Sequence, residues 1–243
     1  MTEILWVVIP AYNEELYITS CLKSFARQTD GAFRIVVVDN ASTDQTREVA
    51  LQTARDLGLE VDVVSEKRKG TGWASRRGFD YAIEKGARIL ARTDADCEVD
   101  KNWVKEMRVL LGRYDFVGGV LKIDASEPWI VKAKFVVIYA IIWWVVGWRR
   151  VREGGYRKRF LLAPGGNLGI TAKMYTRVGG FSQSSIETLD EDTDLASRVL
   201  RVTRRAIGSR RVAVTSSSRR LVTLGFRGTL RWYGFKTEQG DIR

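Results

Sequence analysis

ILARTDAD, at residues 89–96, runs from an apolar segment directly into two carboxylates. The apolar part, residues 89–93, predicts a buried strand. Three further strands are predicted before it, at residues 5–9, 35–38 and 61–64, and the first of these is a continuous apolar run. Helices are predicted between these strands, at residues 16–28, 43–57 and 73–85, with Asn13 as the cap of the first. This alternation predicts βαβ units, and therefore an α/β fold with a mainly parallel sheet flanked by helices.

Polar residues follow three of the predicted strands, at residues 10–14, 39–40 and 93–96. In a parallel α/β sheet, ligands bind beyond the carboxyl ends of the strands. Asp94 and Asp96 there suit a hard cation such as Mg²⁺ or Mn²⁺, which would offset negative charge on a departing nucleoside diphosphate. The same pattern also occurs in surface turns, because aspartate favours turns and caps. The preceding strand favours the metal site.

Asp39 ends the second strand and is expected to accept a hydrogen bond from a base or ribose. A helix cap is the alternative for this region, because Ser42 and Gln45 match a capping box. That box accounts for Ser42 and Gln45 but leaves Asp39 and Asn40 unexplained, which favours ligand binding for the latter two.

The second half of the chain is less regular. A strand is predicted at residues 116–122, a turn at 164–167, a helix from the acidic cluster at 190–194 to about residue 204, and a basic, irregular remainder after it. No linker separates a second domain, so we expect one domain at residues 1–215 and a basic extension at 216–243, packed on it or partly flexible.

Asp192 is the candidate catalytic base. The chain has no histidine, so a carboxylate must deprotonate any acceptor hydroxyl. Within the acidic cluster, Glu191 fits a capping box that begins at Thr188, and Asp194 is spaced to pair with Arg198 on the helix surface. Asp192 has no such structural explanation beyond the helix dipole.

The formal net charge of +11 implies a polyanionic partner, which is nucleic acid, anionic lipid or a phosphorylated substrate. Two distant cysteines and an N-terminus without a signal peptide predict a cytoplasmic protein.

The basic loop at residues 67–72 is either a phosphate cradle or a flexible turn. The apolar stretch at 135–148 is short for a membrane span, which needs about 20 residues. It is either a core helix or, with its tryptophans beside arginines, a contact with the cytoplasmic face of an anionic membrane.

Together these segments resemble family 2 glycosyltransferases with the GT-A fold, a Rossmann-like mixed sheet. The resemblance covers residues 7–204. It rests on VIPAYNEE at 8–15, VVDNASTD at 37–44, TDAD at 93–96, GGF at 179–181 and EDTDL at 191–195. It implies an inverting transfer of one sugar from a nucleotide-sugar donor to an acceptor hydroxyl on a glycan or a lipid-linked carrier, in glycan or cell-envelope polysaccharide synthesis. A UDP-sugar is the first expectation, with GDP- and dTDP-sugars as alternatives.

By this similarity, Asp96 ligates Mg²⁺ or Mn²⁺, Asp94 contacts the ribose or the metal, and Asp192 is the catalytic base. The other donor-binding residues it implies are Pro10, Tyr12, Glu14, Asp39, Asn40, Gly70, Arg76 and Ala95. The acceptor side is assigned to Asn167, Gly180 and Glu191.

Two departures from the family pattern are informative. Arg76 stands where asparagine is usual, which puts that donor contact in doubt, although an arginine there could reach the diphosphate. Gly228 replaces the glutamine of the Q-x-x-R-W motif of processive members, so a polymer synthase is not expected. Two other functions stay open, a metal-dependent nucleotidyltransferase and a non-enzymatic binder of anionic lipid or nucleic acid. The non-enzymatic binder is less favoured as the main activity, because it leaves the ordered carboxylates unexplained, and nucleic acid is not an expected partner.

Overall fold

The computed structural model describes residues 3–124, 127–134, 136–137, 140, 164–182, 191–217 and 219. The chain divides into two compact units: residues 1–122 with 161–216, and residues 123–160 with 217–243. All of the sheet lies in the first unit, apart from the last residue of its sixth strand. The domain boundary expected near residue 215 stays a prediction.

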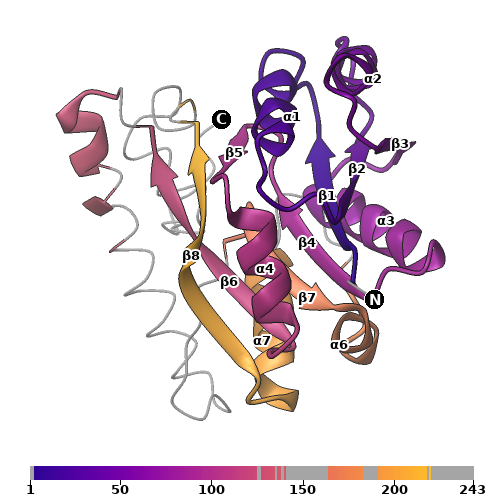
Figure 1. The fold of residues 1–243 in the computed structure, drawn as a ribbon, viewed down its shortest axis with the longest axis vertical. Coiled ribbons are helices and arrows are strands. Elements are labelled where there is room, and N and C mark those ends of the chain that lie inside the picture. Colours follow the sequence, from indigo (N-terminus) through magenta and orange to yellow (C-terminus); the bar gives the residue numbers. More distant parts are fainter. Residues whose placement is uncertain are drawn as a thin grey trace, which may run out of the picture. The chain divides into compact units, whose positions relative to one another are not determined.

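The first unit alternates strands and helices along its first half (Figure 1). The strands are β1 (Leu5–Ala11), β2 (Phe33–Asp39), β3 (Val61–Ser65), β4 (Ile89–Thr93), β5 (Cys97–Val99), β6 (Phe116–Ile123), β7 (Asn167–Thr171) and β8 (Ala206–Ser216). The helices are α1 (Ile18–Ala26), α2 (Thr46–Leu57), α3 (Thr71–Glu84), α4 (Trp103–Leu111), α6 (Ala172–Arg177) and α7 (Glu191–Val202).

The eight strands form one mixed sheet in the order β3-β2-β1-β4-β7-β6-β8-β5. β1 to β4 are parallel neighbours. β7 runs antiparallel to both β4 and β6, and β5 runs antiparallel to β8. The predicted α/β class and its mainly parallel sheet are confirmed in the half of the chain where strands and helices alternate.

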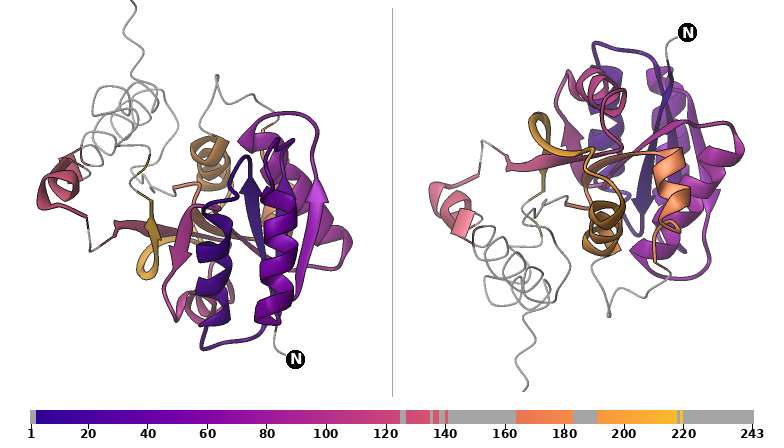
Figure 2. Two further views of the ribbon diagram at one scale, coloured as in Figure 1. Left: turned by 90° about the horizontal axis from the view of Figure 1, so that it is seen from above. Right: turned by 90° about the horizontal axis from the view of Figure 1, so that it is seen from below.

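Side chains of β1 alternate between two cores, because successive residues of a strand point to opposite faces of the sheet. Leu5, Val7 and Ile9 belong to one core, and Trp6 and Val8 belong to the other. The first core packs against α1, α2 and α4, and the second against α3, α6 and α7. Figure 2 shows α1 and α2 on the opposite side of the sheet from α7. Burial on both faces explains the continuous apolar run of β1.

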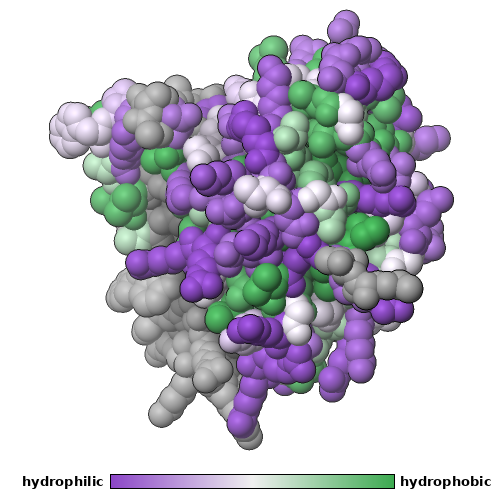
Figure 3. Space-filling view, viewed as in Figure 1, coloured by the Kyte–Doolittle hydropathy of each residue, from purple (hydrophilic) through white to green (hydrophobic). Residues whose placement is uncertain are grey.

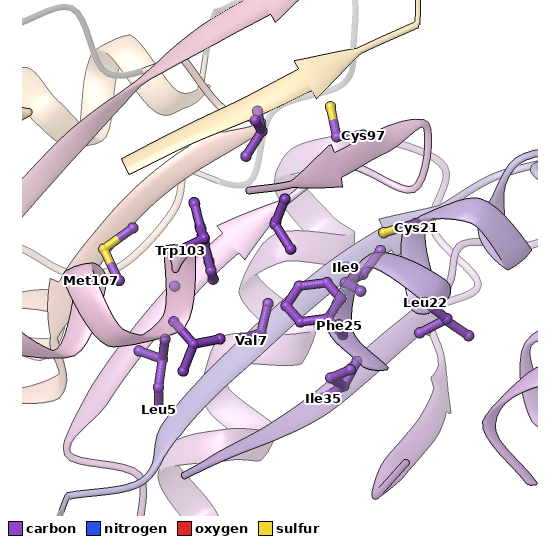
Figure 4. Close-up of a cluster of buried hydrophobic side chains, with 14 of the residues drawn as sticks. Leu5, Val7, Ile9, Cys21, Leu22, Phe25, Ile35, Cys97, Trp103 and Met107 are labelled. Atoms are coloured by element: carbon purple, nitrogen blue, oxygen red, sulfur yellow. The ribbon is translucent and has the colours of Figure 1, made fainter. Parts of the chain in front are cut away.

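The first core is organised around aromatic rings (Figure 4). Phe25 of α1 meets Trp103 of α4 edge to face, with ring centroids 6.0 Å apart and planes at 89°. Met107 and Leu22 add fully buried side chains from the same two helices. Outside this core, the face that carries α1 and α4 is mainly hydrophilic (Figure 3). The parallel half of the sheet is therefore fixed by burial on both sides.

The prediction of an irregular remainder after residue 204 was wrong. Residues 206–216 form β8, which pairs with the short strand β5. Only Val212, Ala213 and Val214 of β8 are fully buried, and Arg210 and Arg211 interrupt the apolar pattern. Most of the stretch at 135–148 lies outside the described residues. Among the residues that the structure does describe, no helix is long and apolar enough to cross a membrane.

Candidate active site

The carboxyl ends of the parallel strands meet at one edge of the sheet. Ala11 at the end of β1 is paired with Asp39 at the end of β2, which is paired with Ser65 at the end of β3. β4 lies on the other side of β1, with Arg92 opposite Val8. Since α1 and α2 pack on one face and α3 on the other, the chain changes face between β1 and β4. Such a switch point is where α/β sheets bind ligands.

The loops after β1 and β2 are joined by hydrogen bonds. The Asn13 backbone N–H donates to Ser42 Oγ at 3.1 Å, and Asn13 Oδ1 accepts from the Thr43 backbone at 2.8 Å. The Gln45 backbone N–H donates to Glu15 Oε2 at 2.9 Å. Asn13 has a φ of 55°, in the left-handed region that asparagine tolerates better than most residues. The two loops therefore form one rigid rim of the site.

Both helix caps predicted for this region were wrong. α1 begins at Ile18, with Tyr17 as its N-cap, and Asn13 bonds to the neighbouring loop instead. α2 has Gln45 as its N-cap with no side-chain cap bond, while Ser42 accepts from Asn13. Asn13 and Ser42, which were predicted to cap these helices, instead form hydrogen bonds that join the two loops.

Three predicted donor-binding residues follow β1 or end it. Pro10 is half-buried near the end of the strand. Tyr12 is exposed, and Lys69 Nζ donates to its hydroxyl at 3.1 Å. The Glu14 backbone N–H donates to Thr46 Oγ1 at 2.7 Å, and its side chain is half-buried. Tyr12 and Glu14 thus lie on the rigid rim.

Asp39 and Asn40 differ in what they leave for a ligand. Asp39 Oδ1 accepts from the Ser42 backbone at 3.1 Å, and the other carboxylate oxygen has no partner among the described residues. Asn40 is buried, and its amide donates to the carbonyls of Glu66 at 3.1 Å and Arg68 at 2.7 Å. Its Oδ1 accepts from the Gly70 backbone at 2.8 Å. Asn40 therefore supports the loop after β3, while Asp39 has an acceptor to offer.

The loop after β3 is held in place and presents basic side chains. The buried Glu66 carboxylate accepts from the Arg68 backbone at 2.8 Å and from Arg68 Nε at 2.9 Å. Hydrogen bonds from the Arg68 side chain, stronger than the opposing effect of burial, lower the pKa of Glu66. The Arg68 guanidinium stacks 3.7 Å from the Trp73 ring centroid. Gly70, with a φ of 142°, is the N-cap of α3, so the loop leads into a helix N-terminus that favours anions.

Asp94 and Asp96 lie just past β4, with the buried Ala95 between them. Atoms of Asp94, Asp96 and Cys97 that could bind a metal lie within 4.8 Å of one another, and they form the one such group found in the described residues. A Cβ added to Gly166 would lie 2.9 Å from Asp94 Oδ2, so only glycine lets that turn come so close. The paired carboxylates and this close backbone fit a hard cation.

Two buried thiols lie under these carboxylates. Burial, followed by the charges of Asp96 and Asp94, raises the pKa of Cys21 well above its ordinary value. Burial and the same two charges also raise the pKa of Cys97. Both cysteines are free and remain neutral thiols at physiological pH.

Asp192 occupies the first turn of α7, and Asp190 lies outside the described residues. Asp192 Oδ2 accepts from the Gly165 backbone N–H at 2.5 Å, and Oδ1 accepts from the Thr193 backbone at 2.6 Å. These bonds fix the carboxylate against the 164–167 turn. The predicted surface pair of Asp194 and Arg198 is confirmed, with 2.8 Å between Oδ2 and Nη2.

Arg92 is the site residue that sequence reasoning missed. It is 3% exposed on β4, and its Nη2 donates to Asp94 Oδ1 at 3.1 Å. Its Nη1 donates to Glu191 Oε1 at 2.9 Å, across 99 residues of sequence. Burial alone would lower the pKa of Arg92, but the charges of Asp94, Glu191 and Asp192 outweigh it and raise that pKa. The available signal was a single charged residue within an apolar strand.

Three other predicted residues, Arg76, Gly180 and Asn167, contact neighbouring parts of the fold. Arg76 Nη1 donates to the carbonyls of Gly179 and Phe181, each at 3.1 Å, so its guanidinium is turned toward that loop, and its contact with a diphosphate stays a prediction. Gly180 has a φ of 72°, and a Cβ there would lie 2.9 Å from the Tyr175 ring. Gly180 therefore permits a tight turn against an aromatic side chain.

Asn167 is fully buried within the sheet. Its amide donates to the carbonyls of Val120 at 2.9 Å and Val212 at 3.1 Å, and its Oδ1 accepts from Trp103 Nε1 at 2.9 Å. The structure thus places Asn167 as a link between strands and α4, and its assignment to the acceptor side stays a prediction.

The site as a whole combines three chemical capacities. Asp39 offers an acceptor for a base or ribose, and the basic loop at 66–70 lies beside a helix N-terminus. Asp94 and Asp96 could hold a cation. Asp192, whose neighbour Glu191 is bonded through Arg92 to Asp94, could accept a proton.

Comparison with known proteins supports a specific family. The model of glycosyl transferase family 2 matches residues 6–177. A PGL/p-HBAD biosynthesis glycosyltransferase of Mycobacterium bovis is 35% identical over 94 residues, which cover 39% of this chain and 37% of the relative. The matched region thus spans about a third of that relative's length.

Two solved structures share the fold. Staphylococcus aureus TarS 1–349 in complex with UDP-GlcNAc superposes with a TM-score of 0.64 at 18% identity, covering 88% of this chain and 58% of that one. The mannosyltransferase PcManGT from Pyrobaculum calidifontis, in complex with GDP-Man and Mn²⁺, gives a TM-score of 0.59 at 20% identity, covering 87% and 56%. At these identities the likeness concerns the fold.

Proposed function

The chain belongs to glycosyl transferase family 2, and we propose that it transfers one sugar from a nucleotide-sugar donor to an acceptor hydroxyl with inversion at the anomeric carbon. A UDP-sugar is the first candidate donor, because the TarS structure holds UDP-GlcNAc. GDP- and dTDP-sugars are the alternatives, and the mannosyltransferase complex with GDP-Man supports the former. The proposed acceptor is a glycan or a lipid-linked carrier in cell-envelope polysaccharide synthesis.

One observation carries this proposal. Asp94, after β4, and Asp192, at the start of α7, lie against the same neighbours although they are far apart in sequence. A Cβ on Gly165 would lie 3.0 Å from Asp192 Oδ2 and 3.0 Å from Arg92 Nη2, the atom bonded to Asp94. Asp94, on the donor side, and Asp192, the candidate base, thus lie close together. This arrangement can bring two bound substrates together for transfer of a group from one to the other.

In the proposed reaction, Asp192 accepts the proton of the acceptor hydroxyl as its oxygen attacks the anomeric carbon. The new C–O bond forms on the side opposite the bond between the anomeric carbon and the diphosphate. That older bond breaks, and the nucleoside diphosphate leaves with its electron pair. The bonds from Gly165 and Thr193 orient the Asp192 carboxylate before the substrate arrives, so little reorganisation is needed during the reaction.

Asp96, with Asp94, would hold Mg²⁺ or Mn²⁺. When bound, such an ion supplies positive charge that offsets the charge developing on the leaving diphosphate. Asp94 Oδ1 is bonded to Arg92, and the similarity to the family pattern makes Asp96 the firmer candidate ligand. The Asp39 oxygen that has no partner among the described residues would accept a hydrogen bond from the base or ribose of the donor.

A thermal-shift panel of nucleotide sugars with Mn²⁺ tests the donor. A ligand that binds only the folded state raises the Tm, and at 100 times its Kd it stabilises by about 2.7 kcal/mol. We expect one class of nucleotide sugar to raise the Tm in a Mn²⁺-dependent way. Incubation of that donor with acceptor extracts should then release a nucleoside diphosphate. Release of pyrophosphate would instead identify a nucleotidyltransferase, and no response to any donor would contradict the proposal.

We also propose that the second unit contacts an anionic lipid surface. Residues 129–134 are helical, and Trp129 and Ile130 are 77% and 48% exposed beside Lys132 and Lys134. Apolar side chains next to basic ones are typical of helices that lie at a lipid headgroup layer. Such contact would bring the enzyme to a lipid-linked acceptor on the cytoplasmic face of a membrane.

Vesicle flotation measures this contact. We expect binding to vesicles with anionic lipid, weaker binding at high salt, and a clear loss on replacing Trp129 and Ile130 with serine. Val109→Ser is the matched control, because Val109 is also 48% exposed but lies on α4 of the first unit. Absence of flotation with both anionic and neutral vesicles would rule out the contact.

A further inference from the structure

A buried guanidinium lies between the two halves of the active site. Arg92 faces away from water on β4, at 3% exposure. A buried charge is costly unless it is paired, and Arg92 is surrounded by Asp94, Glu191 and Asp192. An arginine in such a strand therefore needs carboxylates from elsewhere in the fold.

The two terminal nitrogens of Arg92 hold different elements. Nη2 is bonded to Asp94, which follows the same strand and lies beside the candidate metal ligand Asp96. Nη1 is bonded to Glu191, the first residue of α7. Asp192 is the next residue, so the bond between Arg92 and Glu191 also restrains the backbone position of Asp192.

Gly165 completes the arrangement. Its backbone N–H donates to Asp192, and the space above its Cα is occupied by Arg92 and Asp192. A shift of the Arg92 side chain would therefore change the geometry of the hydrogen bond between Gly165 and Asp192. That amide proton reports the position of the base.

We propose that Arg92 is a positioning residue, which sets the base Asp192 at a fixed place relative to the donor-side carboxylate Asp94. The inference rests on the proposed transfer reaction. A planar guanidinium can hold two carboxylates through separate nitrogens, whereas a lysine ammonium is a single point charge. The role therefore requires arginine and not merely a positive charge.

Arg92→Lys tests the role, because it keeps the charge but removes one arm of the bridge. We expect kcat to fall by about 10- to 100-fold, because small misplacements of a catalytic group have effects of this size. The donor KM should change less than kcat, because Asp94 is the one proposed donor-side residue bonded to Arg92 in the described part of the chain, while Asp39 and the loop at 66–70 are not bonded to it. A merely structural role would lower the Tm and leave kcat and KM of the folded enzyme unchanged.

Arg198→Lys is the matched control. Arg198 also pairs with a carboxylate of α7, Asp194, but does not contact Asp94 or Glu191 in the described residues. Loss of that pair should lower the Tm with kcat nearly unchanged. An equal loss of kcat in both variants would overturn the proposal.

Amide hydrogen exchange at Gly165, measured by NMR, gives a readout without turnover. We expect faster exchange in Arg92→Lys and wild-type exchange in Arg198→Lys. Unchanged exchange in Arg92→Lys overturns the inference even if no donor is found, so its failure is distinct from failure of the proposed reaction.

Arg92→Met combined with Glu191→Gln covers the case in which Arg92→Lys does not fold. This double variant replaces the buried ion pair with neutral side chains of similar size, a change that buried pairs often tolerate. We expect a folded protein with fast Gly165 exchange and a similarly reduced kcat. A fully active double variant would contradict the positioning role.

Discussion

Asp192→Asn is expected to lower kcat by about 10²- to 10⁴-fold, the usual contribution of a general base. Asparagine keeps the shape of the side chain but cannot accept the proton of the acceptor hydroxyl. It also supplies one acceptor oxygen where Asp192 uses both, toward Gly165 and Thr193, so a small loss of Tm accompanies the change. Steady-state kinetics with the donor identified by thermal shift measure the effect.

Donor binding should survive this change. Calorimetry with the nucleotide sugar and Mn²⁺ should give a Kd within a few-fold of the wild type, because the proposed donor contacts lie at the ends of β1 to β4. Asp194→Asn is the control, since it removes a carboxylate of the same helix that is paired with Arg198. Wild-type turnover in Asp192→Asn would remove Asp192 from the role of base.

Asp96→Ala is expected to abolish the Mn²⁺-dependent part of nucleoside diphosphate binding. A bound cation stabilises phosphate charge by several kcal/mol, so its loss should weaken binding by about 10²-fold or more. Titration of nucleoside diphosphate with Mn²⁺, and with a chelator in its place, measures the difference by calorimetry.

Glu98→Ala is the control for that experiment. It removes the same charge two residues further on, where Glu98 is half exposed and pairs with Arg27. Metal-dependent binding should persist in this variant. Equal binding by Asp96→Ala and the wild type would show that Asp96 does not hold the metal.

The parallel half of the fold could be predicted because its signals are local. β1 and β2 carry continuous apolar runs, and β1, β2 and β3 are each followed by a helix of ordinary length, so βαβ units can be read directly from the sequence. β4 was predicted with its observed bounds, Ile89–Thr93. The placement of Asp94 and Asp96 followed from the same rule, since the ends of parallel strands share one edge.

The remaining features depend on partners distant in sequence. β5 has three residues, and β8 carries two arginines in its middle, so neither shows a strand pattern without the other. The capping box at Ser42 was wrong because Ser42 bonds to Asn13, which is 29 residues away. Arg92 went unnoticed because its chemistry depends on Glu191, which no local pattern joins to it.

The Arg92 bridge has a further consequence for how the protein folds. Glu191 follows Arg92 by 99 residues, so β4 is synthesised long before its partner. Until α7 docks, packing β4 into the sheet buries a guanidinium without Glu191, and removing one partner of a buried pair typically costs about 3–5 kcal/mol. We therefore expect intermediates with a completed parallel sheet and a detached α7 to be disfavoured, and we expect the two halves of the first unit to unfold together as one cooperative transition.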